Sequence, residues 1–150
     1  MKMKSLSNTQ LEELIKKYNL PLNNILMRDE AEYIKDDGFY IINLDTSKGT
    51  GSHWTTCYYH PLKSYYFDSF GFVPCKEIED KIKPYDHNYK DIQDYNSDAC
   101  GYYCIAFIKI LNDKQNKEMG LNQGFKEFLR LFSNKTTEND NILEEYLTGE

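Results

Sequence analysis

Four residues of types used in acyl-transfer chemistry follow one another along the 150-residue chain: His53, Asp68, Gln93 and Cys100. A cysteine attacks a carbonyl carbon as its thiolate, and a free thiol is only a few per cent ionised at neutral pH. A histidine can form a thiolate–imidazolium pair with it and afterwards protonate the leaving amine. A carboxylate can orient the imidazole through the other ring nitrogen. The set therefore contains a nucleophile, a general base and acid, and an orienting group.

The remaining requirement of this chemistry is a group of donors for the tetrahedral oxyanion. We expect the backbone N–H of Cys100 and the side-chain amide of Gln93 to supply them. Cys100 opens a nearly continuous apolar segment that ends at Leu111, which predicts a helix buried on most sides. A thiolate in the first turn of a helix is stabilised by the positive end of the helix dipole. Gly101 leaves room for close approach of substrate or backbone.

Each of these residues also has an ordinary structural explanation when it is considered alone. A single histidine in a strand is usually structural, Asp68 alone would cap a turn, and Gln93 alone would be a polar surface residue. Asp98 is a candidate cap for the helix that begins at Cys100. It is the four-part combination that favours one catalytic site.

The other cysteines and histidines give little sign of a metal site. Cys57, Cys75 and Cys104 are expected to be core or surface thiols. The sequence has no Cys-x2-Cys pair, and the spacing between Cys100 and Cys104 is a poor one for metal ligands. We therefore expect no metal and no cofactor.

The elements that must position these groups alternate between helices and short strands. Apolar spacing predicts helices at about 8–18, 75–83, 99–111 and 122–132, strands at 39–44, 53–59, 64–70 and 89–93, and one helical turn at 142–147. Ser7 or Asn8 is the expected cap of the first helix. Residues 22–37 are expected to be irregular, residues 46–52 to form a flexible loop, and the tail from Ser133 to be polar.

A hairpin turn at residues 60–63 joins two of the predicted strands. If residues 53–59 pair with residues 64–70, His53 and Asp68 lie at the same end of neighbouring strands, within reach of each other. The order of elements favours an α+β fold, a small mixed sheet packed on a central helix that starts at Cys100. A chain of 150 residues has room for one domain, which we place at 1–150.

Composition limits the partners of the chain. Its net charge is −6, and it contains only two arginines, Arg28 and Arg130. Modules that bind DNA, RNA or anionic membranes need basic clusters, so we expect no nucleic-acid and no membrane partner. No apolar run approaches the ~20 residues of a membrane span. No apolar stretch follows the basic N-terminus either, so we expect no secretory signal and cysteines that remain thiols.

The motifs around these residues resemble a known family. His53-Trp54, the Asp-Ser-Phe-Gly-Phe run at 68–72, and the Gln-x6-Cys-Gly-x2-Cys pattern at 93–104 are similar to the adenovirus maturation proteases (adenain). They are more distantly similar to the proteases of SUMO and ubiquitin-like modifiers. The similarity runs from the first helix to Leu111. It implies a papain-type core with a permuted triad order. It also implies the four site roles: Cys100 as nucleophile, His53 as base and acid, Asp68 as orienting carboxylate, Gln93 as oxyanion donor.

The resemblance carries further expectations about the cleft and the substrate. Trp54 matches an aromatic residue that packs beside the active site, and with Gly101 it would support the substrate cleft. Members of this family commonly cleave after glycine, which implies a narrow channel to Cys100 and cleavage at small residues. The short acidic chain is similar to the capsid-maturation proteases of virophages and polinton-type elements. This implies viral capsid or core precursor proteins as substrates, in the virion and the host cytoplasm, and we assume a monomer.

Two alternatives stay open at this point. One is an isopeptidase that removes ubiquitin-like modifiers, and the other is a catalytically silent binding module of the same fold. The deconjugating enzymes usually have Asp directly before the nucleophile, whereas this chain has Ala99 there. Adenovirus proteases are basic and use DNA as an activator, and this acidic chain gives no reason to expect one.

Overall fold

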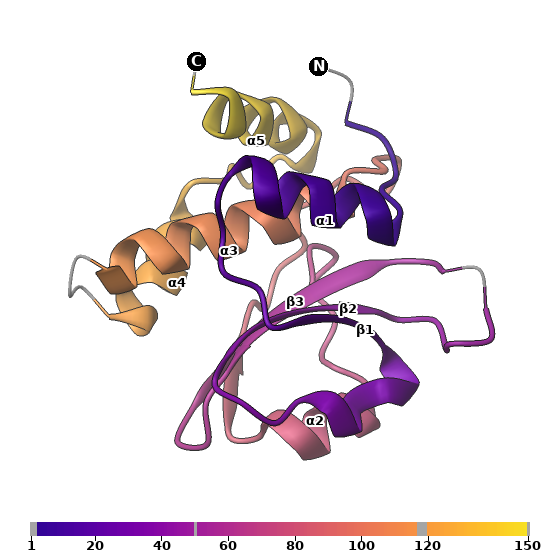
Figure 1. Ribbon diagram of the computed structural model, residues 1–150. Coiled ribbons are helices and arrows are strands. Elements are labelled where there is room, and N and C mark those ends of the chain that lie inside the picture. The colour runs from indigo at the N-terminus through magenta and orange to yellow at the C-terminus, as the bar shows by residue number, and fades with distance from the viewer. Residues whose placement is uncertain (1–2, 50, 117–119, 150) are drawn as a thin grey trace.

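The fold is a five-stranded mixed sheet with helices on both faces (Figure 1). It is seen in a computed structural model that describes residues 3–49, 51–116 and 120–149. Thr50, in the predicted loop at 46–52, therefore lies outside the described residues. The arrangement confirms the predicted α+β class and the packing of a small mixed sheet on a central helix. No helix in the described ranges is long and apolar enough to cross a membrane.

The sheet places the first two candidate residues at one of its ends. Its strands are adjacent in chain order: β1 (Asn24–Met27), β2 (Gly38–Asn43), β3 (Trp54–Tyr59), β4 (Ser64–Phe67) and β5 (Tyr85–His87). The central strands β2, β3 and β4 are antiparallel, and the edge strands run parallel to their neighbours. Thr56 faces Phe67 across the hairpin, which is the predicted register. His53 directly precedes β3 and Asp68 directly follows β4.

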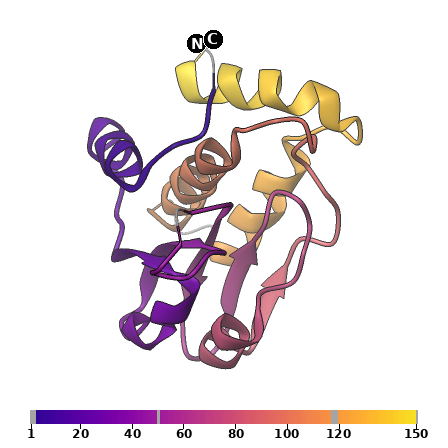
Figure 2. The same cartoon turned by 90° about the vertical axis from the view of Figure 1, so that its right-hand side faces the viewer.

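The helices divide between the two faces of the sheet (Figures 1 and 2). The central helix α3 (Cys100–Asn116) packs on one face, surrounded by α1 (Asn8–Lys17), α4 (Leu121–Arg130) and α5 (Asn139–Thr148). The other face is covered by α2 (Lys76–Ile82) and the 3-10 helix η1 (Arg28–Tyr33). As expected, α3 is buried nearly all round, because it is enclosed by the sheet and by three other helices.

The first helix begins where its sequence predicts. Ser7 caps α1: its hydroxyl accepts a hydrogen bond from the N–H of Gln10, and the side chain of Gln10 accepts one from the N–H of Ser7. This reciprocal pair is a capping box and satisfies two backbone donors at once. Leu11 of α1 is fully buried against α3, which fixes the helix beside the start of α3.

Three segments differ from the expectations. Residues 22–37 contain β1 and η1 instead of irregular chain, and β1 escaped notice because it is a four-residue edge strand with one buried residue, Leu26. The strand expected at 89–93 is wrong; the chain pairs with β4 earlier, at residues 85–87. The polar tail forms a short 3-10 helix, η2 (Thr136–Glu138), and then a full helix, α5, which buries only a narrow stripe of three residues: Asn139, Leu143 and Leu147.

Candidate active site

His53 and Asp68 form a buried pair at the end of the sheet. The imidazole Nε2 lies 2.8 Å from Asp68 Oδ1. The N–H of Phe70 donates to the same oxygen at 2.8 Å, and the Phe70 ring stacks on the imidazole with centroids 4.6 Å apart. Asp68 is fully buried, and among the described residues its other oxygen, Oδ2, has no hydrogen-bond partner. The carboxylate charge is therefore balanced by a protonated imidazole.

Asn88 holds Asp68 in place, a contact that sequence reasoning missed. Its side-chain oxygen accepts from the N–H of Asp68 at 3.2 Å, and its amide donates to the Asp68 carbonyl at 2.7 Å. Asn88 directly follows β5, so its side chain continues the pairing of β5 with β4 one step beyond the last backbone pair. The only signal in the sequence is a polar residue next to a strand, which is too common to indicate this role.

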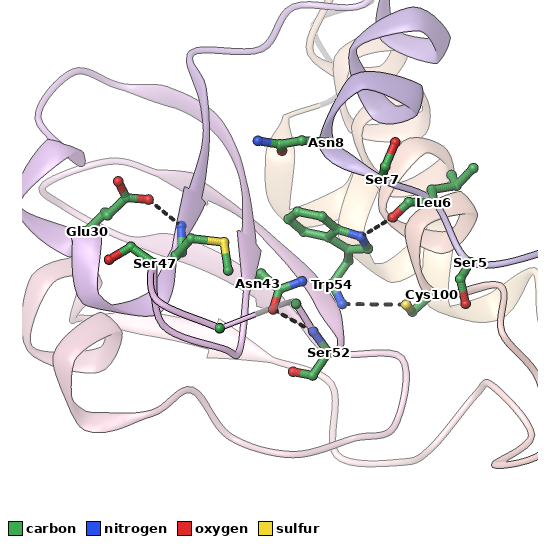
Figure 3. A pocket seen from close by; sticks show the side chains of 13 residues that line it. Ser5, Leu6, Ser7, Asn8, Glu30, Asn43, Ser47, Ser52, Trp54 and Cys100 are labelled. Atoms are coloured by element: carbon green, nitrogen blue, oxygen red, sulfur yellow. Dashed lines mark hydrogen bonds between the residues drawn. The ribbon is translucent and has the colours of Figure 1, made fainter.

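Cys100 is the first residue of α3 and faces His53. Its Sγ accepts a hydrogen bond from the N–H of Trp54 at 3.5 Å, as Figure 3 shows. Since Nε2 of His53 is engaged with Asp68, Nδ1 is the ring nitrogen left for an interaction with Cys100, which together with Asp68 raises the pKa of His53. A backbone donor and the start of a long helix both favour negative charge on the sulfur. The structure thus brings together three of the four sequence-predicted residues: His53, Asp68 and Cys100.

The environment of His53 favours its charged form. Burial is the largest single influence and lowers the pKa of His53, but the hydrogen bonds to Asp68 and Cys100, with their charges, outweigh it and raise this pKa from 6.5 to about 9. The ring is therefore an imidazolium at neutral pH. Burial acts alone on Cys57, whose pKa it raises to about 12, and it also raises the pKa of Cys104 well above its usual value. Those two thiols remain protonated and unreactive.

Gln93 is buried in the loop that leads to Cys100. Its side-chain oxygen accepts from the Ser69 hydroxyl at 2.5 Å, and its amide nitrogen donates to the carbonyl of Ser97 at 2.8 Å and to its hydroxyl at 3.3 Å. Among the described residues no hydrogen bond joins Gln93 to Cys100. The glutamine links the residue after Asp68 to the turn before Cys100, and so ties the two halves of the site together.

Ser97 and Asp140 form a second support that sequence reasoning missed. The Ser97 hydroxyl accepts from the N–H of Ala99 at 3.1 Å and donates to Asp140 of α5 at 2.7 Å. The side chain that accepts from the backbone just before α3 is therefore that of Ser97, whereas Asp98 was the expected cap. Asp140 also accepts from the Tyr103 hydroxyl of α3 at 2.9 Å. A carboxylate 43 residues away along the chain thus fixes the approach to the nucleophile.

Two further contacts join the C-terminal segment to the same loop. The Asn139 amide donates to the carbonyl of Ile92 at 2.8 Å, and the Thr136 hydroxyl donates to Asp94 at 3.0 Å. Asn139 is fully buried. The whole loop from residue 92 to residue 97 is therefore attached to η2 and α5 through side-chain hydrogen bonds.

A cleft of about 580 Å³ opens onto Cys100 (Figure 3). Hereafter called the Cys100 cleft, it has one wall from residues 5–8, just before and at the start of α1, and another from residues between Asn43 and Ser52. Trp54 lies between them, and its indole N–H donates to the carbonyl of Leu6 at 2.8 Å. A Cβ at Gly101 would lie 2.9 Å from Leu6 Cδ1, so this glycine makes room for the N-terminal segment that forms the wall.

The opposite wall is held by side-chain acceptors. Asn43, which is buried, accepts from the N–H of Ser52 at 3.0 Å and from that of Asp45 at 2.9 Å. Asp45 accepts from the N–H of Gly51 at 3.1 Å, and Gly51 has φ +93°, a conformation that favours glycine. These bonds orient the chain as it enters β3 at His53. Within the described ranges, no three His, Cys, Asp or Glu side chains converge as metal ligands.

Comparison with known proteins adds little to this geometry. No protein-family model matches the sequence, and no curated protein matches it significantly. Among solved structures, the effector protein RavZ of Legionella pneumophila is similar over 97% of this chain and 49% of RavZ, with 12% sequence identity and a TM-score of 0.34. The chain thus spans about half the length of RavZ. A TM-score this low carries no argument about function.

Proposed function

We propose that this protein is a cysteine endopeptidase with His53, Asp68 and Cys100 as its triad. The observation that carries the proposal is the His53 ring, which bonds Asp68 through Nε2 and whose pKa is raised by both Asp68 and Cys100, while Cys100 itself lines an open cleft. A buried carboxylate, an imidazolium and a thiol at a helix start are the components that thiol proteases need.

The reaction follows from these positions. The Cys100 thiolate attacks the scissile carbonyl carbon, and the carbonyl π electrons move to oxygen. When the tetrahedral intermediate collapses, the C–N bond breaks and the His53 imidazolium gives its proton to the leaving amine. Neutral His53 then takes a proton from water, which attacks the thioester; the C–S bond breaks and the thiolate returns. Asp68 holds the imidazole through Nε2 throughout, which leaves Nδ1 for the proton transfers.

The oxyanion in this scheme is bound by the N–H of Cys100 and by Gln93. An amide nitrogen carries two hydrogens, and in Gln93 one is given to the Ser97 carbonyl. The other makes a longer contact of 3.3 Å with the Ser97 hydroxyl, so it is the hydrogen available to a substrate oxygen. The bond from Ser69 fixes the orientation of the amide group. We propose that Gln93 is the side-chain donor of the oxyanion site.

The substrates we propose are viral capsid or core precursor proteins, cut after small residues such as glycine. The support for small residues is the indole of Trp54 beside Cys100, between walls held by Leu6 and Asn43. The support for the viral role is the resemblance of the motifs around the triad to the adenovirus maturation proteases. No DNA activator is part of the proposal, because the chain carries a net charge of −6.

The first experiment asks which thiol reacts. Iodoacetamide at pH 7, followed by peptide mass spectrometry, should alkylate Cys100 before the half-buried Cys75 and well before the buried Cys57 and Cys104. His53→Ala should slow labelling of Cys100 and leave Cys75, the matched control thiol, unchanged. Equal labelling of Cys75 and Cys100 in the wild-type protein would overturn the assignment of the nucleophile.

The second experiment asks which proteins are cut. The wild-type protein and Cys100→Ala are each co-expressed with candidate capsid precursors and, separately, with fusions of ubiquitin-like modifiers. We expect cleavage of capsid precursors by the wild-type protein alone. Cleavage of only the modifier fusions would replace the viral role with deconjugation, and no cleavage of either set would favour a binding module.

A further inference from the structure

A second hollow, of about 630 Å³, begins beside His53. Half of its lining residues are aromatic, and we call it the aromatic hollow, defined by Phe70, Phe72, Tyr89 and Tyr95. The rest of the lining consists of Gly71, Lys90, Asp91 and Gln93. Three of these rings are largely exposed: Phe72 by 69%, Tyr89 by 79% and Tyr95 by 83%. Single exposed aromatics are ordinary, but several around one concave surface mark a binding site. Gln93 also lines this hollow, which joins it to the candidate active site.

The aromatic hollow is built by a close approach of two segments. Gly71 ends a turn in which its N–H donates to the Asp68 carbonyl at 2.8 Å, and its φ is +83°. A Cβ at Gly71 would lie 2.8 Å from the backbone of Lys90 and Asp91, so only glycine lets the two segments touch. The Ser69 carbonyl accepts from two N–H groups of the second segment, at 2.8 Å and 3.0 Å. The hollow is therefore part of the scaffold that holds Asp68.

The chemistry of the triad decides which half of a substrate lies there. His53 protonates the leaving amine, so the residues after the scissile bond must lie on the His53 side of Cys100. Phe70 stacks directly on the His53 ring and also lines the aromatic hollow. The Cys100 cleft shares no lining residue with the aromatic hollow. The acyl half of the substrate, which precedes the scissile bond, would therefore occupy the Cys100 cleft.

We propose that the aromatic hollow binds an apolar or aromatic side chain directly after the scissile bond. The inference rests on the proposed endopeptidase function and specifies the substrate residue that follows the cleaved bond. The aromatic rings that line the hollow would stack on such a side chain or pack edge-on against it. The protein would then select small residues before the cleaved bond and large apolar residues after it.

The test separates this subsite from the protease reaction itself. Benzyloxycarbonyl-glycine p-nitrophenyl ester acylates the enzyme without any residue in the aromatic hollow, and the burst of p-nitrophenol reports the acyl-enzyme. Phenylalaninamide or glycinamide is then added at equal concentration to compete with water. The amine nitrogen attacks the thioester carbonyl, His53 takes its proton, and the C–S bond breaks to give benzyloxycarbonyl-glycyl-phenylalaninamide or its glycine analogue. Chromatography measures the two products.

We expect phenylalaninamide to capture the acyl-enzyme about tenfold better than glycinamide, the scale of discrimination that apolar pockets reach. Tyr89→Ser and Tyr95→Ser should each remove most of this preference, which is a ratio of two products and therefore does not depend on the burst rate. Both side chains are exposed, so the fold should tolerate their loss. Tyr33→Ser is the matched control, because Tyr33 is an exposed tyrosine on η1, outside both cavities, and should keep the full preference.

The results that would contradict the subsite differ from the result that would contradict the protease function. A normal burst with equal capture of the two amines by the wild-type protein would overturn the aromatic subsite and leave the protease proposal standing. A preference that survives both Tyr89→Ser and Tyr95→Ser would also overturn it. Absence of any burst would instead overturn the endopeptidase function, and the subsite with it.

Discussion

The two sides of the candidate site are held by different kinds of contact. His53 and Asp68 flank adjacent strands, and their positions follow from the backbone pairing of β3 with β4. Gln93 and Cys100 flank a loop whose position depends on side-chain hydrogen bonds, mostly to η2 and α5. The first side is fixed by the hairpin and by Asn88, which lies 20 positions from Asp68 along the chain. The second is fixed by residues more than forty positions away along the chain.

Backbone pairing and side-chain hydrogen bonds position a residue with different precision. Backbone ladders fix the register of neighbouring strand ends, and a change of register by one residue would move every side chain to the other face. A loop held by side chains can be loosened one bond at a time, because each neutral hydrogen bond contributes only about 1 kcal/mol. Substitution of His53 or Asp68, on the sheet side, should therefore change the chemical step itself. Substitution of a residue that holds the loop before Cys100, on the loop side, should shift the loop slightly and lower activity by a smaller factor.

The largest effect is expected from the two residues that exchange the proton. Cys100→Ala and His53→Ala should each reduce turnover by on the order of 10⁴ or more, since members of a triad act as a unit. Hydrolysis of the glycine ester measures this loss. Circular dichroism melting should show that both variants still unfold cooperatively. If His53→Ala retained most of the activity, the sheet side would not contribute to catalysis.

Asp68→Asn should have the next largest effect, a loss of about 10³–10⁴ in turnover. The amide keeps the size of the side chain but removes the charge that stabilises the imidazolium. The pKa of His53 should fall, because its hydrogen bond to the carboxylate is the main influence that raises it. NMR titration of the His53 ring measures this shift directly. A pKa of His53 that did not move would show that Cys100 alone holds the charge.

The pH dependence of the wild-type protein tests the same ion pair. Because the pKa of His53 is raised to about 9, activity should fall about tenfold per pH unit above that value, as the imidazolium is lost. Stability follows the same direction. The contribution of charged His53 is complete below pH 6.5 and is lost as the pH rises through about 9. An alkaline limit of activity near pH 7 would contradict this description of the sheet side.

The loop side should give the smallest effect. Asp140→Asn weakens the bond to the Ser97 hydroxyl, and we expect a several-fold loss of kcat with little change in KM, since the loop that carries Gln93 becomes less well fixed. Glu145→Gln is the control, because Glu145 is an exposed acid on the same helix. Equal effects of the two substitutions would point to a general effect of charge on α5, without any role for the loop contact.

The same comparison explains what the sequence could predict. The hairpin register was readable because two segments rich in strand-forming residues and the turn between them lie within one continuous stretch, and that register places His53 beside Asp68. The buried helix beginning at Cys100 was readable for a similar reason. The contacts of Asn88, Ser97 and Asp140 were not, because each is a single polar residue whose partner is distant in sequence.

The walls of the Cys100 cleft could be predicted from the sequence only in part. Trp54 and Gly101 were expected beside the cleft, but the contact that explains both is Leu6, whose carbonyl binds the indole and whose side chain fills the space above the glycine. Nothing in the sequence near Leu6 predicts this. The aromatic hollow was invisible for another reason: a chain with 13 tyrosines gives no indication of which of them stay exposed.

The attachment of α5 to the loop before Cys100 also has a consequence for protein synthesis. Translation proceeds from the N-terminus, so Cys100 leaves the ribosome before Asp140, which follows it by 40 residues. During that interval the loop that carries Gln93 has no bond to α5. We expect the ribosome-bound chain to remain a poor enzyme until α5 emerges and docks. The order of synthesis would then protect neighbouring unfinished chains from premature cleavage.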